Sequence, residues 1–279
     1  MKNKQNIKSL LIYITCIILI IISLSLGIKK ISNDNKKKGK EKNIEEKISY
    51  YKPEYKDRYN KYRKENKDLS NEQVIIDVNI GLDYNYYENS KPSKNLNKET
   101  ILVNKYNYLQ QDYIPNNLEN ISTEYARSGM SLVNYAKDAF EDLAKAAKKE
   151  GMSIIAMSSY RSYKYQYNLY NKYKAQDGEE VADTYSARPG YSEHQTGLAV
   201  DVYNGKESFT NFENAKEFDW MQKNAYKYGF ILRFPKNKTK ETGYDYESWH
   251  YRYVGISIAK YIHENDISFE EYYVKKIEK

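Results

Sequence analysis

Two of the three histidines in the chain stand in short segments that could hold a metal ion. His194 precedes Asp201 by seven residues, and Glu247 precedes His250 by three. A catalytic zinc ion takes about three protein ligands and keeps one position open. His194, Asp201 and His250 would supply two imidazoles and one carboxylate, and Gly197 allows a turn between the first two. The spacing therefore indicates a candidate zinc site.

The two acidic residues of these segments have different expected roles. Asp201 lies in an otherwise apolar stretch that is typical of a strand. An unpaired carboxylate is costly to bury there, and metal binding would remove that cost. Glu247 could lie beside the metal without binding it, take a proton from the attacking water and deliver it to the leaving amine. Spacing alone leaves structural roles open, because Asp201 could cap a turn and Glu247 could pair with Arg252.

Arg161 is a candidate for binding a carboxylate. It follows the apolar stretch 153–157 and a short polar turn, a place from which a side chain can project into a cleft. A guanidinium can bind a carboxylate through two parallel hydrogen bonds, which is what a carboxypeptidase needs to recognise a chain end. An ordinary surface ion pair explains the same residue and, without further context, is the simpler interpretation.

Several other kinds of site are excluded or poorly supported. Cys16 is the single cysteine and lies in an apolar run, so the rest of the chain has no disulfide framework and no thiolate metal site. A Ser-x-x-Lys spacing occurs at Ser49–Lys52 and at Ser257–Lys260, but the Ser-Asp-Asn and Lys-Thr-Gly segments of serine D,D-peptidases are missing. The net charge is +7, yet no zinc-finger or RNP motif accompanies it, so we expect no nucleic-acid partner.

The second half of the chain predicts an α+β domain. Short apolar stretches typical of strands alternate with amphipathic stretches typical of helices. The expected strands are residues 153–157, 199–202, 230–234 and 249–253. The expected helices cover residues 132–147, a polar stretch through Leu169 and Tyr173, the region around Trp220, and residues 256–263.

The first half is less regular. Residues 74–80 place Ile76, Val78 and Ile80 on one face, which predicts a strand that Gly81 ends, and residues 101–103 predict a second short strand. We assign residues 70–128 to an N-terminal lead-in subdomain of unknown role. Four tyrosines recur at helical spacing before it, which predicts a helix packing on the domain rather than a wall-contacting stripe: Tyr51, Tyr55, Tyr59 and Tyr62.

The N-terminal end predicts a membrane anchor. Residues 10–28 are rich in Leu and Ile, and their length suits a helix that spans a bilayer. We expect an uncleaved signal anchor, with residues 1–9 as a basic cytoplasmic tail and residues 29–69 as a Lys/Tyr-rich stalk in contact with anionic lipid or wall polymer. More lysines follow the span than precede it, which by the positive-inside rule favours a cytoplasmic domain.

Three motifs together closely resemble the VanY-type D-alanyl-D-alanine carboxypeptidases, which share a fold with the hedgehog signalling domain. They are Ser-x-His-x-x-Gly-x-Ala-x-Asp at residues 192–201, Glu-x-Trp-His at residues 247–250 and Ser-Tyr-Arg-Ser-Tyr at residues 159–163. The resemblance implies a small antiparallel sheet flanked by helices and a VanY-type domain over residues 129–279. The family commonly has Pro where this chain has Ser248, a change that removes no chemical group.

The resemblance also implies roles for the site residues. His194, Asp201 and His250 would bind zinc, Glu247 would act as general base and acid, and Arg161 would stabilise the substrate or the developing oxyanion. Ser192 and Gln166 would line the substrate cleft, whereas His263 matches no ligand position.

The implied activity is the removal of the terminal D-alanine from peptidoglycan stem peptides. That substrate places the catalytic domain outside the cytoplasm, on a single-pass membrane protein. An L,D-carboxypeptidase acting on tetrapeptide stems and a non-catalytic wall-binding protein are the alternatives that the motifs leave open.

Overall fold

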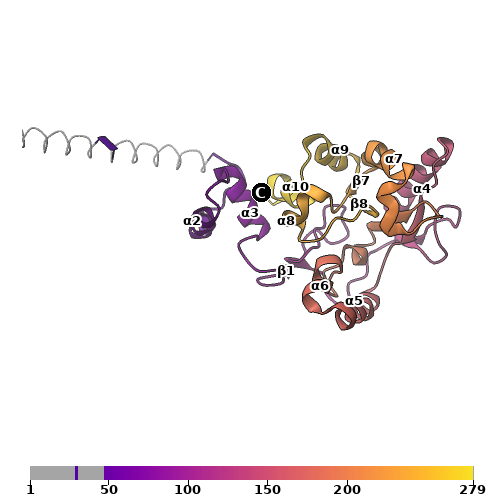
Figure 1. Cartoon of the computed structure of the whole chain (residues 1–279), viewed down its shortest axis with the longest axis horizontal. Helices are drawn as coiled ribbons and strands as arrows, with labels where there is room; N and C mark the ends of the chain where they lie inside the picture. Colours follow the sequence, from indigo (N-terminus) through magenta and orange to yellow (C-terminus); the bar gives the residue numbers. More distant parts are fainter. Residues whose placement is uncertain (1–28, 31–46, 279) are drawn as a thin grey trace, which may run out of the picture. The chain divides into compact units, whose positions relative to one another are not determined.

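The computed structural model describes residues 29–30 and 47–278 (Figure 1). The chain divides into two units, Met1–Glu54 and Tyr55–Lys279. The predicted tail and anchor, and most of the stalk before residue 47, lie outside the described residues. Among the helices of the described part, none has both the length and the apolar character needed to cross a bilayer. The account below concerns the unit Tyr55–Lys279.

A four-stranded antiparallel sheet forms the centre of this unit. Its order is β5-β6-β8-β7, in which β5 is Ile155–Ser158, β6 is Ala199–Tyr203, β8 is His250–Tyr253 and β7 is Phe230–Leu232. All four strands overlap stretches that the sequence predicts as strands, and β5 and β6 each extend one residue beyond the predicted end. The α+β prediction and the small antiparallel sheet are therefore confirmed.

The two faces of the sheet have different environments because successive side chains of a strand point to opposite faces. Val200, Val202 and Tyr251 point into the main apolar core, where they meet residues of α4 (Asn134–Lys149) and α7 (Lys216–Asn224). Asp201 and His250 alternate with them and therefore point to the other face. The polar side chains of these strands are thus gathered on the face turned away from α4 and α7.

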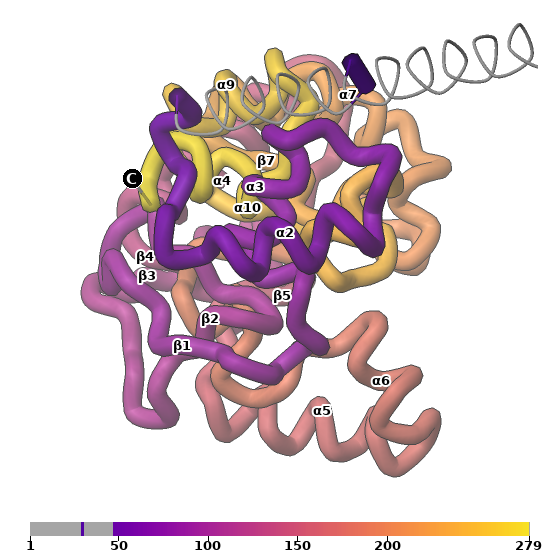
Figure 2. Tube along the Cα trace, turned by 90° about the vertical axis from the view of Figure 1, so that its left-hand side faces the viewer, coloured from indigo at the N-terminus to yellow at the C-terminus, as the bar shows by residue number. Residues whose placement is uncertain are grey.

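The remaining helices surround this frame. Helices α5 (Tyr163–Asp177) and α6 (Glu179–Tyr185) lie next to each other (Figure 2), and α9 (Ile256–Asn265) and α10 (Phe269–Tyr272) contribute to a second apolar cluster. The other short helices of this unit are α8 (Thr239–Thr242), the 3-10 helices η2 (Glu193–Thr196), η3 (Phe209–Asn214), η4 (Ala225–Tyr228) and η5 (Lys236–Lys238), and the π-helix η6 (Tyr273–Ile277). In the sequence, η1 (Pro53–Tyr55) spans the division between the two units.

The strand predicted over residues 74–80 is wrong, because these residues belong to helix α3 (Asn71–Ile80). The Ser70 side chain accepts a hydrogen bond from the backbone N–H of Gln73 and caps the start of the helix, and Gly81 ends it in a left-handed conformation. Every residue from Val74 to Ile80 is buried. The alternation of Ile76, Val78 and Ile80 with polar residues therefore does not separate a buried face from an exposed one.

Residues 101–103 also form no strand, although Ile101 and Val103 are buried in the main core. The predicted tyrosine helix is present in part as α2 (Lys56–Glu65), in which Tyr59 and Tyr62 are buried against α3 as expected. Tyr51 and Tyr55 precede this helix. The Tyr59 hydroxyl donates to Asn79 Oδ1. The predicted helix packing is confirmed at these two residues.

Segment 70–128 shares its core with the second half of the chain and lies within the same compact unit. It contributes Leu109 and Ile121 to the main core, together with Ile101 and Val103. It also carries a small parallel pair of β1 (Lys91–Pro92) with β2 (Asn107–Tyr108). Its strand β3 (Leu118–Asn120) pairs antiparallel with β4 (Ser131–Val133), which lies just beyond the segment.

Lys105 is a further link between this segment and the second half. The residue is only 2% exposed, and its ammonium group lies 4.2 Å from the ring centre of Tyr86 and 4.6 Å from that of Tyr244. Nζ donates a 2.7 Å hydrogen bond to the carbonyl of Asp183 in α6. Burial lowers the pKa of Lys105 to about 8, and the nearby carboxylates of Asp183 and Asp245 only partly offset this effect.

Candidate metal centre and active site

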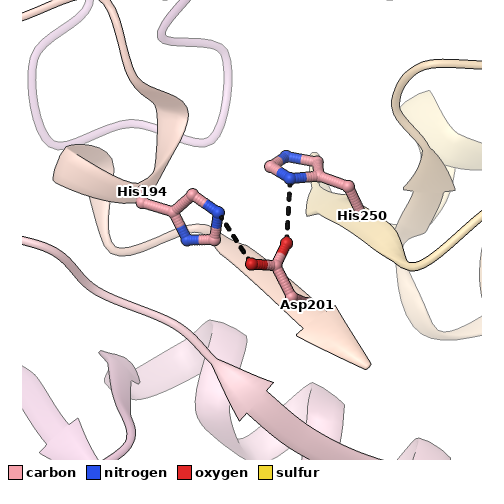
Figure 3. A group of neighbouring side chains, drawn as sticks. All are labelled: His194, Asp201 and His250. Atoms are coloured by element: carbon pink, nitrogen blue, oxygen red, sulfur yellow. Dashed lines mark hydrogen bonds and ion pairs between the residues drawn. The ribbon is translucent and has the colours of Figure 1, made fainter. Parts of the chain in front are cut away.

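His194, Asp201 and His250 come together on the polar face of the sheet (Figure 3). His194 lies on η2, Asp201 on β6 and His250 on β8. His194 Nε2 lies 3.3 Å from Asp201 Oδ2, and His250 Nδ1 lies 3.1 Å from Asp201 Oδ1. One ligand atom from each residue lies within 4.8 Å of the others, and all three residues are buried. The structure thus brings the three predicted ligands into one cluster.

The local fold explains why these side chains meet. In the pairing of β6 with β8, Asp201 stands directly opposite His250, so both side chains leave the sheet on the same face. Gly197 ends η2 with a φ of 69°. The chain turns there and enters β6, so Asp201 on β6 can lie close to His194 on η2. The carbonyl of Ser159 lies 2.6 Å from His194 Nδ1 and accepts its hydrogen, which leaves Nε2 directed toward Asp201.

The protonation states of this cluster fit a divalent metal. Burial and the charge of Arg161 lower the pKa of His194 to about 4, so its imidazole is neutral, the form that binds a metal. Burial opposes the ionisation of Asp201, but His194 and Arg161 outweigh it and hold the pKa of that carboxyl well below its usual value. Two imidazoles and one carboxylate are a donor set that zinc accepts.

His250 would exchange a proton for the metal. Burial acts to lower its pKa, but the neighbouring carboxylates of Asp201 and Glu193 outweigh burial and raise the pKa to about 9. A metal at Nδ1 must therefore displace a proton from this ring at neutral pH.

Glu247 lies at the edge of the cluster. Its Oε2 is 3.6 Å from His250 Nδ1, and the side chain is largely buried. Burial is the main cause that raises the pKa of Glu247 to about 7, and the negative charge of Asp201 adds to it. A carboxyl group with a pKa near the operating pH is suited to accept a proton and then return it.

Arg161 also points into the cluster. Its Nη2 donates a 2.6 Å hydrogen bond to Asp201 Oδ2, and both Nε and Nη2 donate to Ser158 Oγ. The bulge between Ala156 and Ser158 brings Ser158 opposite Asp201 in the sheet. The structure therefore places the predicted carboxylate-binding arginine beside a predicted ligand, while its role toward substrate stays a prediction.

The two predicted cleft residues are buried. Ser192 directly precedes η2, and Gln166 on α5 donates a 2.8 Å hydrogen bond to the carbonyl of Ala187. Gln166 Oε1 has no hydrogen-bond partner within the described part of the chain. Their contact with substrate stays a prediction. His263 is exposed on α9, and its ring stacks on that of Tyr226 with ring centres 4.0 Å apart. It is not one of the three clustered residues.

Sequence reasoning missed Glu193, which is buried beside His194. Its Oε1 accepts hydrogen bonds from Arg233 Nε at 2.9 Å and Arg252 Nη1 at 2.7 Å. The two guanidinium groups outweigh burial and hold the pKa of Glu193 well below its usual value. Arg252 thus pairs with Glu193 and not with Glu247. The alternation of β8 offered a signal, because it puts Arg252 on the same face as His250.

Comparison with known proteins agrees with this geometry. Residues 129–256 match the family model described as VanY, D-alanyl-D-alanine carboxypeptidase. A Bacillus subtilis protein named "Putative carboxypeptidase YodJ" is 44% identical over 192 residues, which cover 65% of this chain and 70% of that protein.

Two solved structures are similar to the chain. The LdcB LD-carboxypeptidase is 40% identical with a TM-score of 0.63, and the match covers 67% of this chain and 91% of that one. A variant of the vancomycin-resistance D,D-pentapeptidase VanY in complex with Zn(II) is 35% identical with a TM-score of 0.52, over 62% of this chain and 98% of that one. The clustered His194, Asp201 and His250, and the relatives that match the segment containing them, show that the chain belongs to the VanY family of D-alanyl-D-alanine carboxypeptidases.

Proposed function

We propose that this protein is a zinc-dependent carboxypeptidase that removes the C-terminal D-alanine from peptidoglycan stem peptides. The observation that carries this proposal is the buried cluster of His194, Asp201 and His250 with the Glu247 carboxyl group at its edge. Metal-assisted hydrolysis needs a bound metal ion and a nearby group that accepts a proton. The three ligands would supply the first, and Glu247, whose pKa is raised to about 7, would supply the second.

Zinc bound by these three residues would polarise the scissile carbonyl and increase the acidity of the attacking water. Glu247 would accept the proton of that water and donate it to the leaving amine of D-alanine. Arg161 donates to Asp201 through Nη2, and its planar fork can still present a donor to a substrate carboxylate or to the oxygen that becomes negative.

The replacement Glu247→Gln tests this assignment. It keeps the size of the side chain but removes the proton acceptor, so the rate of D-alanine release should fall by about 10²- to 10⁴-fold. Zinc content, measured on the same sample, should stay at one ion per chain because Glu247 is not among the three ligands. Release at the wild-type rate by this variant would contradict the mechanism.

A second candidate is an L,D-carboxypeptidase that trims tetrapeptide stems. The LdcB LD-carboxypeptidase is 40% identical to this chain, compared with 35% for the VanY D,D-pentapeptidase. Purified protein should be incubated separately with pentapeptide and tetrapeptide stems, and the products identified by mass spectrometry. Shortening of the pentapeptide alone supports the D,D-activity, and shortening of the tetrapeptide alone supports the L,D-activity.

We further propose that residues 10–28 anchor the protein in the cytoplasmic membrane and that the catalytic unit faces outward. The support is the apolar sequence of this stretch and the extracytoplasmic place of peptidoglycan stems. The lysines after the stretch would then meet anionic lipid or wall polymer. Protease treatment of intact protoplasts is the test, because an outward-facing unit is digested while a cytoplasmic one is protected.

A further inference from the structure

Two buried polar atoms face each other at the ring nitrogen of His250 that does not face Asp201. His250 Nε2 and Glu193 Oε2 each lack a hydrogen-bond partner within the described part of the chain. They lie 3.5 Å apart. An unpaired buried polar atom costs about 1–3 kcal/mol, so two such atoms this close gain by completing a hydrogen bond with each other.

Glu193 cannot easily turn away from His250. Its other oxygen, Oε1, is held by Arg233 and Arg252 at once. All three side chains are almost fully buried. With Oε1 fixed by two charged donors, the lone pairs of Oε2 remain directed at the imidazole.

The two arginines are themselves fixed. Arg233 donates two hydrogen bonds to the carboxylate of Glu270 on α10. Arg252 Nη2 donates to the backbone carbonyls of Glu99 and Ile101. The carboxylate of Glu193 is therefore held through the two arginines by α10 on one side and by the backbone of residues 99–101 on the other.

We propose that Glu193 is a positioning residue that keeps the hydrogen of His250 on Nε2, so that Nδ1 is free to bind the metal. The inference rests on the zinc site of the proposed function. The same arrangement holds for His194, whose Nδ1 hydrogen is accepted by the Ser159 carbonyl while Nε2 faces Asp201. Each ligand ring is thus oriented by an acceptor on its far side, a carbonyl in one case and a carboxylate in the other.

The substitution Glu193→Gln separates this role from a packing role. The amide oxygen would stay with the two arginines, which only donate, and the amide N–H₂ would face His250 Nε2. An N–H₂ group there favours the ring form with hydrogen on Nδ1, the atom that must bind the metal. Zinc affinity, measured by competition with a chromophoric chelator, should therefore fall about 10- to 100-fold.

Glu270→Gln is the matched control. Glu270 is as buried as Glu193 and binds the same Arg233, but Arg233 and Glu193 stand between it and His250. It should lower stability without changing zinc affinity by more than about twofold. An equal loss of zinc affinity in both variants, or none in Glu193→Gln, would overturn the positioning role.

A direct measurement covers the case in which a variant does not fold. In the wild-type protein loaded with zinc and labelled with ¹⁵N-histidine, His250 should show a slowly exchanging hydrogen on Nε2. A hydrogen on Nδ1 would overturn the inference while leaving the zinc enzyme intact. A wild-type chain that binds no zinc would overturn the proposed function as well, so the two failures are distinguishable.

Discussion

At the scale of single residues, Arg161 donates hydrogen bonds to two side chains, those of Asp201 and Ser158. Its Nη2 binds Asp201, while Ser158 Oγ accepts from both Nε and Nη2. The Arg161 side chain is about one-fifth exposed, so it is not sealed within the protein. The shape of the planar fork, and not only its charge, therefore matters at this position.

The substitution Arg161→Lys should lower kcat/KM for D-alanine release by about 10²-fold, because an ammonium group cannot bind two oxygens in one plane. Steady-state kinetics on a stem peptide measure the effect. Arg58→Lys is the control, since Arg58 pairs with Asp83 and takes no part in the metal cluster. Equal kinetics for Arg161→Lys and the wild type would remove Arg161 from the substrate site.

The sequence predicts the residues of the metal cluster better than their surroundings. His194, Asp201, His250 and Glu247 lie within two short motifs, so their types and spacing are visible in the chain. The partners of Glu193 lie 40 and 59 residues away in Arg233 and Arg252. Strand alternation can place Arg252 on the face of His250, but it cannot identify Glu193 as its partner. That ion pair forms only when distant parts of the chain come together in the sheet.

At the scale of elements, strands with one buried and one polar face were predictable, and α3 was not. Strand β6 alternates Val200 and Val202 in the core with Asp201 on the other face, which is the period of two that defines a strand. Helix α3 is buried through seven successive residues, including the polar Asp77 and Asn79, so the alternation that suggested a strand does not mark an exposed face. Only its caps, Ser70 and Gly81, distinguish it from a strand.

The turn at Gly197 joins η2 to β6 and is tightly enclosed. A Cβ atom at this position would lie 2.9 Å from Leu118 Cδ2 and 3.0 Å from Val133 Cγ2, with a φ of 69°. The substitution Gly197→Ala should therefore lower the free energy of unfolding by about 3 kcal/mol, since strain and crowding add. Denaturant unfolding measures this loss.

Gly151→Ala provides the comparison for Gly197. Gly151 has a similar φ of 74°, but nothing lies within 4 Å of its added Cβ. Only backbone strain remains there, so the expected loss is about 1 kcal/mol. Equal losses at both positions would mean that crowding at Gly197 is relieved by movement of its neighbours.

At the scale of the whole molecule, the family-matched residues 129–256 do not form a complete core. Ile101, Val103 and Leu109 are buried in the same cluster as the sheet, and Arg252 donates to the carbonyls of Glu99 and Ile101. Removing segment 70–128 would expose apolar surface of the main core and leave the buried Arg252 without two of its hydrogen-bond acceptors.

A fragment of residues 129–279 should therefore fail to fold, while residues 47–279 should fold. The dispersion of amide signals in ¹H–¹⁵N NMR spectra distinguishes the two outcomes. A well-dispersed spectrum from the shorter fragment would show that segment 70–128 is an independent addition to the fold.

Lys105 predicts a pH dependence of stability. Its pKa is about 8 in the folded protein and near 10.5 in the unfolded chain, so the unfolded state binds more protons between these values. The free energy of unfolding should rise as pH increases from about 8 toward 10. In Lys105→Met this contribution is absent, so the stability difference between wild type and variant should change from pH 7.5 to pH 9.5. A constant difference would contradict the lowered pKa.

The enclosure of Lys105 also makes it a chemical reporter. An amine with a pKa of about 8 is a good nucleophile in mildly alkaline solution, yet Tyr86, Tyr244 and the Asp183 carbonyl cover it. An acylating reagent can reach it only when Tyr86, Tyr244 or α6 moves away from it. The rate at which Lys105 is acylated, followed by peptide mass spectrometry, therefore measures how often this part of the molecule opens.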